Sequence, residues 1–262
     1  VGLGTVSDGT YTDTLSDPAD IENFITGSGA DYFIMSASHI NTAYNLDGNG
    51  GTDTLSYSAL GAANYIDINF SGGADTVTIN GGVADNVNDI ESFVGTQGAD
   101  AFHAFDGDGN LTLDGHTGND TYDGSGLAGA ITVDLSTGTV HTGTDTDSFT
   151  NMERFTGGID SDMFIADTDG QDYAFIGNAD GANGDSVDFS AATGGITVDL
   201  SNIGAQAIGG GFGNYTLQDL ENITGSGFDD TLEGNTADNE LTGGAGNDFL
   251  IGGDGSDTYD GG

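Results

Sequence analysis

Residues 225–260 read GSGFDDTLE GNTADNELT GGAGNDFLI GGDGSDTYD, which is four nonapeptides in uninterrupted register. In each of them Gly stands at the first place, Asp or Asn at the sixth, and Leu or Tyr at the eighth. Gly allows the positive-φ backbone of a tight turn, and a large apolar residue between polar neighbours is typical of a strand with one buried face. Each nonapeptide therefore predicts a turn followed by a short strand, and two of them complete one coil of a parallel β-solenoid.

Such a coil places the sixth residues of alternate nonapeptides next to each other. Asp230 is then beside Asp248, and Asn239 beside Asp257, at the strand spacing of about 4.8 Å. Two carboxylates at that distance repel each other unless a cation lies between them. Carboxylate and turn carbonyl oxygens are ligands that Ca²⁺ prefers, whereas a chain with no Cys and four His is poorly suited to zinc or copper. The segment therefore predicts several bound calcium ions.

The last two nonapeptides, GGAGNDFLI and GGDGSDTYD, resemble the repeats of RTX (repeats-in-toxin) proteins, and we expect a secreted surface-layer or filament type. The resemblance implies an all-β, right-handed parallel β-solenoid, or β-roll, with calcium in its turns. It also implies secretion from a Gram-negative bacterium without a cleaved N-terminal signal. Asn239 departs from the pattern, so we expect the site that it shares with Asp257 to be weaker. The alternative is a flexible Gly- and Asp-rich linker, which would not need a constant apolar place.

Isolated nonapeptides also occur upstream of this run, and the one around Asp185 is one residue short of a match. In another, Leu111 stands where the ligand is expected. We predict metal ligands at the sixth-place residues Asp31, Asp53, Asp100, Asp120, Asp162, Asp185, Asp230, Asn239, Asp248 and Asp257. We add the turn glycines of the C-terminal run, Gly225, Gly227, Gly243, Gly244, Gly246, Gly252, Gly253 and Gly255.

A longer repeat runs through the whole chain. The motifs IENFITGSGAD, IESFVGTQGAD, MERFTGGIDSD and LENITGSGFDD end at positions 31, 100, 162 and 230. We predict one continuous solenoid of about four units of about 67 residues each. Residues 1–50 would be a short N-terminal unit or cap, followed by 51–117, 118–183 and 184–262, the last with the dense run at 225–262. The sequence leaves open whether the Glu of each motif ligates metal or caps a turn; these residues are Glu22, Glu91, Glu153 and Glu221.

The composition restricts the partners. Asp and Glu total 43 against one basic residue, Arg154, which gives a formal net charge of −42. This charge argues against nucleic acid or anionic lipid as a partner, and it would favour disorder unless bound cations offset it. We therefore expect folding and calcium binding to be one reaction. The sequence contains no apolar run of the length that a membrane span needs.

We do not expect an enzyme. The sequence contains no HExxH zinc motif, no GxSxG nucleophile motif and no Lys for a phosphate-binding loop. A catalytic pair of carboxylates would occur once, whereas the Asp residues here recur at every turn. The histidines, with no closely spaced pair among them, are expected to be exposed turn or strand residues; they are His39, His103, His116 and His141.

Two functions fit these observations. The first is a secreted calcium-binding structural protein, a subunit of an extracellular filament, sheath, surface layer or adhesive stalk on a bacterial surface. It would self-associate into a polymer or layer, and we expect head-to-tail stacking because the chain stops two residues into another nonapeptide. The second is a secretion and folding module of a larger exported enzyme, toxin or adhesin. A cell-surface polysaccharide is a further candidate partner.

Overall fold

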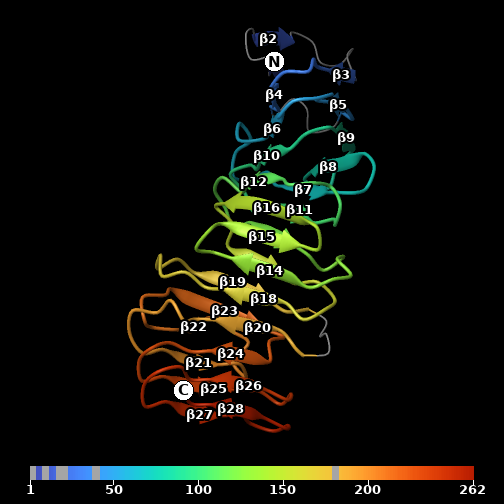
Figure 1. Cartoon of the computed structure of the whole chain (residues 1–262). Helices are drawn as coiled ribbons and strands as arrows, with labels where there is room; N and C mark the ends of the chain where they lie inside the picture. The colour runs from blue at the N-terminus through green and yellow to red at the C-terminus, as the bar shows by residue number, and fades with distance from the viewer. Residues whose placement is uncertain (1–3, 8–11, 16–22, 37–41, 179–182) are drawn as a thin grey trace. The chain divides into compact units, whose positions relative to one another are not determined.

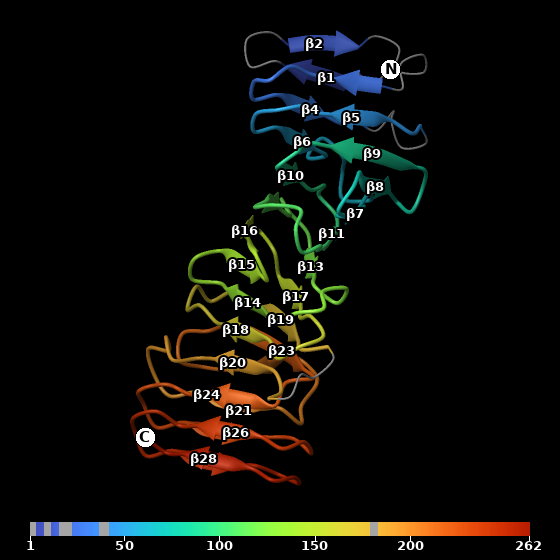
Figure 2. The ribbon, with the colours of Figure 1, turned by 45° about the vertical axis from the view of Figure 1, so that its right-hand side comes forward.

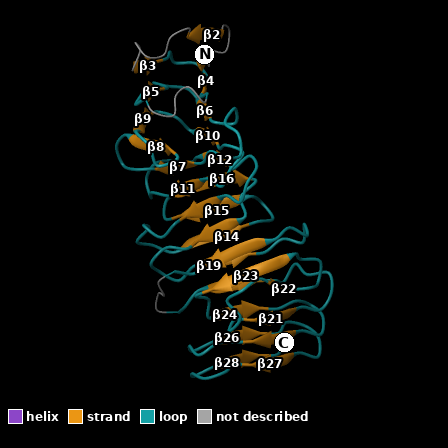
Figure 3. Cartoon of the chain, turned by 180° about the vertical axis from the view of Figure 1, so that it is seen from behind, coloured by secondary structure: helices purple, strands orange, loops and turns teal. Residues whose placement is uncertain are grey.

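The computed structural model describes residues 4–7, 12–15, 23–36, 42–178 and 183–262. Within these ranges the secondary structure consists of strands joined by turns, with no helix (Figure 1, Figure 3), so the predicted all-β fold is confirmed. The chain forms two compact units. The first unit is Val1–Asp123 with Thr144–Met152, and the second is Gly124–Gly143 with Glu153–Gly262. The predicted division into four units of about 67 residues stays a prediction.

The first unit carries two rows of hydrogen-bonded strands. One row has the order β2-β1-β4-β6-β10-β12-β16, and the other has the order β3-β5-β9-β8-β7-β11-β13. The strands are β1 (Gly4–Ser7), β2 (Thr12–Leu15), β3 (Asn23–Ile25), β4 (Tyr32–Ile34), β5 (Asn45–Asp47), β6 (Thr54–Ser56), β7 (Ile66–Asn69), β8 (Asp75–Ile79), β9 (Ala84–Asn88), β10 (Ser92–Val94), β11 (Ala101–His103), β12 (Thr112–Asp114), β13 (Thr121–Asp123) and β16 (Asp145–Thr150).

The second unit carries three rows. Their orders are β15-β14-β18-β20-β24-β26-β28, β17-β19-β23-β22 and β21-β25-β27. Figure 2 shows β24, β26 and β28 as successive rungs of the first row. The strands are β14 (Ile131–Asp134), β15 (Thr139–Thr142), β17 (Arg154–Thr156), β18 (Met163–Ile165), β19 (Tyr173–Ile176), β20 (Ser186–Asp188), β21 (Thr197–Asp199), β22 (Gln206–Ala207), β23 (Asn214–Gln218), β24 (Asn222–Thr224), β25 (Thr231–Glu233), β26 (Glu240–Thr242), β27 (Phe249–Ile251) and β28 (Thr258–Asp260).

The coils stack their apolar places in register. Leu232 pairs with Leu250, and Leu241 pairs with Tyr259, as the repeat of nine predicts. Most strands have three residues, with the middle side chain buried and its two neighbours turned outward. One column of middle side chains in the first unit is Phe33, Leu55, Phe93, Leu113 and Phe149, all of them buried. The core of each unit is therefore a set of such columns between the rows.

Antiparallel hairpins interrupt the parallel ladder, which the repeat analysis did not predict. β7 pairs antiparallel with β8 and β8 with β9, and β14 pairs antiparallel with β15. The turn between β8 and β9 contains Asn80 at φ 56° and Gly81 at φ 66°. An Asn-Gly pair with positive φ at both residues is a typical signal for a tight hairpin. The strands that contain Asp67 and Asp134, β7 and β14, thus lead into hairpins instead of plain coils.

The buried column of the second unit offers a test of the core. Phe164 has no exposed surface and stacks on Phe175 with ring centroids 4.8 Å apart, whereas Phe249 is 61% exposed. Phe164→Ala is expected to lower the free energy of unfolding by about 3–5 kcal/mol, because it removes a buried ring and leaves a cavity. Phe249→Ala is expected to change it by less than about 0.5 kcal/mol. Urea denaturation at one calcium concentration measures both, and equal losses would contradict this assignment of the core.

Candidate metal sites

In each row of parallel strands, the residue two positions before the central apolar residue of a strand lies beside its counterpart in the next coil. We call such a column of residues a file. In the second unit one file contains Asp162, Asp185, Glu221, Asn239 and Asp257. A shorter file, before β21, β25 and β27, contains Ile196, Asp230 and Asp248. The files of the first unit are Asp31, Asp53, Glu91, Leu111 and Asp147, then Ile66, Asp100 and Asp120, then Tyr44 and Asp85.

Hydrogen bonds connect the residues of a file. The backbone N–H of Asp230 donates to Oδ1 of Asp248 at 2.9 Å, and the N–H of Asn239 donates to Oδ1 of Asp257 at 3.1 Å. These two neighbour pairs are the ones that the sequence predicted. The corresponding distance is 2.7 Å from Asp31 to Asp53, from Asp100 to Asp120 and from Asp162 to Asp185. One oxygen of each accepting carboxylate is thereby held against the backbone of the preceding coil.

The second carboxylate oxygen is without a hydrogen-bond partner at several of these positions. Among the described residues, Oδ2 of Asp53, Asp162 and Asp248 is buried and accepts no hydrogen bond, and the same holds for both oxygens of Asp31. A buried acceptor that is left unsatisfied costs roughly 1–3 kcal/mol, and more when it is charged. These oxygens therefore fit a bound cation.

Glycine leaves the space into which these oxygens point. A Cβ atom added at Gly225 would lie 2.6 Å from the carbonyl oxygen of Gly243 and 2.7 Å from Oδ2 of Asp230. At Gly244, where φ is +93°, a Cβ would overlap the carbonyl oxygen of Ser226 in the preceding coil. The other predicted turn glycines that face an oxygen in this way are Gly243, Gly246, Gly252, Gly253 and Gly255. At Gly227 a Cβ would meet nothing within 4 Å.

Carboxylates and carbonyls thus line the same small spaces, as a calcium site with six to eight oxygen ligands requires. No three His, Asp or Glu side chains come together as a metal cluster within the described ranges. A nonapeptide site would therefore draw most of its ligands from the backbone. The metal-binding role of each predicted residue stays a prediction.

The predicted ligands differ in how well the protein itself satisfies them. Asp100 accepts the N–H of Thr96 at 2.6 Å and its hydroxyl at 2.9 Å, and Ser226 makes the equivalent pair of bonds to Asp230. The amide of Asn239 donates to the carbonyl of Glu221 at 2.7 Å. A hydroxyl or an amide N–H at these positions supplies a further donor, whereas Oδ2 of Asp53, Asp162 and Asp248 has none.

Burial of the carboxylates is visible in their acidity. Burial raises the pKa of Asp162 to about 6. It also raises the pKa values of Asp53 and Asp100, in both cases against hydrogen bonds that lower them. In the folded chain without a cation, burial therefore disfavours the charged form of these three carboxylates.

The structure also resolves part of the question about the glutamates. Oε2 of Glu91 accepts the N–H of Asp53, and Oε2 of Glu221 accepts the N–H of Asp185, both at 2.8 Å. They occupy file positions and satisfy the backbone there, as the Asp residues do. The carbonyl of Glu153 accepts the N–H of Ala174 at 2.8 Å. Glu22 lies outside the described residues.

Two further buried acids belong to the files and were missed from the sequence. Asp85 accepts the N–H of Tyr44 at 2.9 Å and the hydroxyl of Tyr57 at 3.4 Å. Asp147 accepts the N–H of Leu111 at 3.0 Å and the hydroxyl of Tyr122 at 2.9 Å. Both stand two residues before a buried apolar side chain, as Asp53 and Glu91 do. An acid two residues before an apolar strand residue was therefore the sequence signal that could have identified Asp85 and Asp147, although no nonapeptide glycines accompany them.

Of the histidines, His39 lies outside the described residues. The ring of His103 lies between two carboxylates, with Nδ1 2.8 Å from Asp123 and Nε2 3.2 Å from Asp67. The bond to Asp123 is the main reason that the pKa of His103 is raised. Both ring nitrogens thus face acids on the outside of the strand row, which fits the expected strand position.

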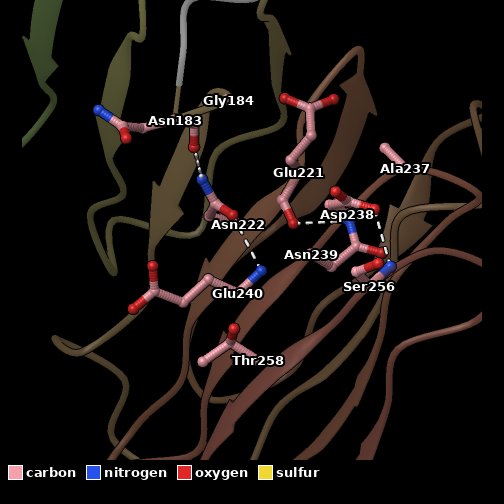
Figure 4. Close-up of a pocket in the computed structure, with 10 residues that line it drawn as sticks. All are labelled: Asn183, Gly184, Glu221, Asn222, Ala237, Asp238, Asn239, Glu240, Ser256 and Thr258. Atoms are coloured by element: carbon pink, nitrogen blue, oxygen red, sulfur yellow. Dashed lines mark hydrogen bonds between the residues drawn. The ribbon is translucent and has the colours of Figure 1, made fainter.

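An open groove of about 360 Å³ runs beside the longer file of the second unit (Figure 4). Hydrogen bonds cross its floor from Asn222 to the carbonyl of Asn183, from Glu240 N–H to Asn222, and from Ser256 N–H to Asp238. The groove is lined by polar atoms for the most part, and Glu221 and Asn239 of the file are among its lining residues.

The glycine geometry gives a matched pair of variants. Gly244→Ala is expected to cost at least about 1–2 kcal/mol of stability, because alanine is strained at positive φ and its Cβ would overlap the Ser226 carbonyl. It should also raise the calcium concentration needed for half-maximal folding. Gly227→Ala, in open space, is expected to stay within about 0.5 kcal/mol of the native chain. Calcium titrations followed by circular dichroism compare the two, and equal behaviour would contradict the described turn.

Burial of Asp85 predicts a pH dependence of stability, to be measured at one calcium concentration at which the chain is folded. Burial raises the pKa of Asp85 to about 7, against the hydrogen bonds from Tyr44 and Tyr57. Because the folded-state pKa is raised, this contribution to stability is fully present below the ordinary pKa of about 4 and is lost as the pH rises through about 7. The free energy of unfolding should therefore fall between about pH 4 and pH 7.

Asp85→Asn is expected to make this fall less steep by up to about one proton, since the amide does not titrate and keeps an oxygen for the Tyr44 N–H. The exposed Asp254, changed to Asn, serves as the control. Denaturation curves across this pH range measure the slope, and an Asp85→Asn profile identical to that of the native chain would contradict the assignment.

Comparison with known proteins bears on the C-terminal run. Residues 223–262 match the family model of the RTX calcium-binding nonapeptide repeat, in four copies. No curated protein matches the chain. The described residues contain no helix that is long and apolar enough to cross a lipid bilayer. With the repeat, its stacked coils and its oxygen-lined turns described, residues 223–262 of this chain are identified as RTX-type calcium-binding nonapeptide repeats.

Proposed function

We propose that this chain is a secreted structural protein, which forms an extracellular filament, sheath, surface layer or adhesive stalk and which folds and assembles as calcium binds. RTX repeats are typical of secreted bacterial proteins. The observation that carries the proposal is the stacking of acids in files, with partnerless oxygens at Asp53, Asp162 and Asp248. Such a repeated arrangement suits a role in building structure better than a single catalytic centre.

Charge explains why calcium would control folding. The 43 acidic side chains have one basic side chain, Arg154, to oppose them, and the files bring carboxylates to neighbouring rungs. Bound calcium would supply the positive charge between those rungs. Sites of this kind in extracellular modules bind calcium at about 10⁻⁴–10⁻³ M, so the chain would stay unfolded before export and fold outside the cell.

Each part of a nonapeptide has a distinct role in this proposal. The first-place glycine leaves room for the ion, the sixth-place carboxylate binds it, and the eighth-place side chain, as at Leu232 and Leu241, anchors the strand in the core. In the C-terminal run the ions would be held by Asp230, Asn239, Asp248 and Asp257 together with turn carbonyls. Exposed apolar rings in the same run provide surface for contact between copies; these are Phe228, Phe249 and Tyr259.

A second candidate is a secretion and folding module of a larger exported enzyme, toxin or adhesin. It is favoured by the family match, which is confined to residues 223–262. In that case the same calcium-dependent folding would serve export of the attached protein. The complete coding sequence distinguishes the two candidates, since a catalytic or pore-forming region joined to this chain would favour the module.

Removal of calcium tests the proposed function directly. With excess chelator the chain is expected to lose its β-sheet circular dichroism signal, because unscreened carboxylates oppose the compact state. Electron microscopy of the same samples should show filaments or layers at millimolar calcium that disperse on chelation. An unchanged β-sheet signal after thorough chelation would contradict calcium-dependent folding, and single monodisperse particles at millimolar calcium would contradict assembly.

A matched pair of variants controls for nonspecific charge effects in that experiment. Asp248→Asn removes a charge whose Oδ2 is buried without a partner, and Asp254→Asn removes an exposed charge from the next nonapeptide. The first should raise the calcium concentration at the folding midpoint, by roughly tenfold or more. The second should leave it close to that of the native chain. Equal shifts would show that net charge alone matters.

A further inference from the structure

In two interior coils, a nonapeptide is paired with a segment that is not a nonapeptide. In the first unit, the nonapeptide at residues 48–56 ends with β6, which pairs with β10. The segment before β10, residues 88–91, reads Asn-Asp-Ile-Glu and lacks the glycine-rich turn. Glu91 nevertheless occupies the file position next to Asp53. A short Asp-Ile-Glu segment thus stands where a second nonapeptide would otherwise be.

The backbone of this segment reproduces one feature of a nonapeptide. Asp89 has φ 50°, and its carbonyl oxygen occupies the place that a Cβ at Gly48 would take. In a pair of nonapeptides the carbonyl of the next first-place glycine lies there, as Gly243 does over Gly225. Because Asp89 has a left-handed backbone conformation, its carbonyl oxygen lies where the carbonyl oxygen of a glycine turn lies in a pair of nonapeptides.

The carboxylate that faces this space is buried and incompletely satisfied. Asp53 has no exposed surface. Its Oδ1 accepts the N–H of Asp31 at 2.7 Å, while its Oδ2 lies 2.5 Å from the Cβ position of Gly48 and has no hydrogen-bond partner among the described residues. Its N–H donates to Oε2 of Glu91 at 2.8 Å. Three acids, Asp31, Asp53 and Glu91, are therefore consecutive in one file and repel one another.

The same arrangement recurs in the second unit. Residues 218–221 read Gln-Asp-Leu-Glu, and Asp219 has φ 52°. Its carbonyl oxygen occupies the Cβ position of Gly177, beside Oδ2 of Asp185. The N–H of Asp185 donates to Oε2 of Glu221 at 2.8 Å. Two independent instances with the same dihedral angle and the same bond indicate a built site.

We propose that Asp53, the carbonyl oxygen of Asp89 and the carboxylate of Glu91 hold a calcium ion, and that Asp185, Asp219 and Glu221 hold another in the same way. A single nonapeptide then binds calcium against an Asp-apolar-Glu segment, without a second glycine turn. The longer Glu side chain spans the distance that the missing turn would have covered. This inference rests on the proposed calcium-dependent folding and extends it to residues outside the family match at 223–262.

Glu91→Gln tests the proposal in the full chain, with Asp53→Asn as the second variant. Each amide keeps an oxygen to accept the same backbone N–H and removes only the charge. Glu240→Gln, an exposed position in the second unit, is the matched control. Isothermal titration with calcium counts the bound ions, and hydrogen–deuterium exchange reads residues 48–56 and 225–262 separately across the titration.

Both variants are expected to bind about one calcium ion fewer than the native chain. They should also need a calcium concentration at least roughly tenfold higher to protect the amides of residues 48–56 from exchange. Protection of residues 225–262 and the behaviour of Glu240→Gln should match the native chain. An unchanged ion count and midpoint in Glu91→Gln would overturn the proposal. So would faster exchange at 48–56 by the same factor at every calcium concentration at which the chain is folded, since that marks a purely structural bond.

The result also separates this proposal from the proposed function. Loss of calcium protection at 225–262 in the native chain would refute calcium-dependent folding as a whole. Calcium protection at 225–262 with none at 48–56 would refute only the mixed site.

Discussion

Repulsion between stacked carboxylates is the constraint on which the rest of this structure depends. A parallel coil repeats every residue at one strand spacing, so an acid that precedes one strand lies beside the acid that precedes the next. Asp162 and Asp185, or Asp230 and Asp248, are brought together in this way. The chain has one basic side chain to offset this charge. Any account of its stability must therefore include what offsets the repulsion between these acids.

The buried core residues and the file residues belong to the same short segments of the chain. In each short strand the middle side chain is buried, and the file residue stands two positions before it, as Asp53 stands before Leu55. Packing of the apolar column sets the spacing of the file, and the hydrogen bond from one backbone N–H to the next carboxylate sets its orientation. Metal binding, strand pairing and core packing are for this reason expected to be lost together when calcium is removed.

Small changes of residue type alter how each file position is satisfied. Asp leaves an oxygen for a cation, Asn239 supplies its own donor, and Ser226 or Thr96 at the second place of a turn donates a hydroxyl to the carboxylate. Glu91 reaches the same backbone position from a coil that has no glycine turn. A single architecture can thus carry file positions that differ in how completely the protein itself satisfies the carboxylate.

The sequence by itself determined the coil: its period of nine places Leu232 on Leu250 and Asp230 beside Asp248, because strand alternation leaves no other face for either residue. Only the tertiary structure decided which other acids join the files. Asp53 and Glu91 are 38 residues apart, with the hairpin strands β8 and β9 between them, so no local period relates them. The hairpins change the number of residues per coil, and a file is defined by neighbours in space, not by spacing along the chain.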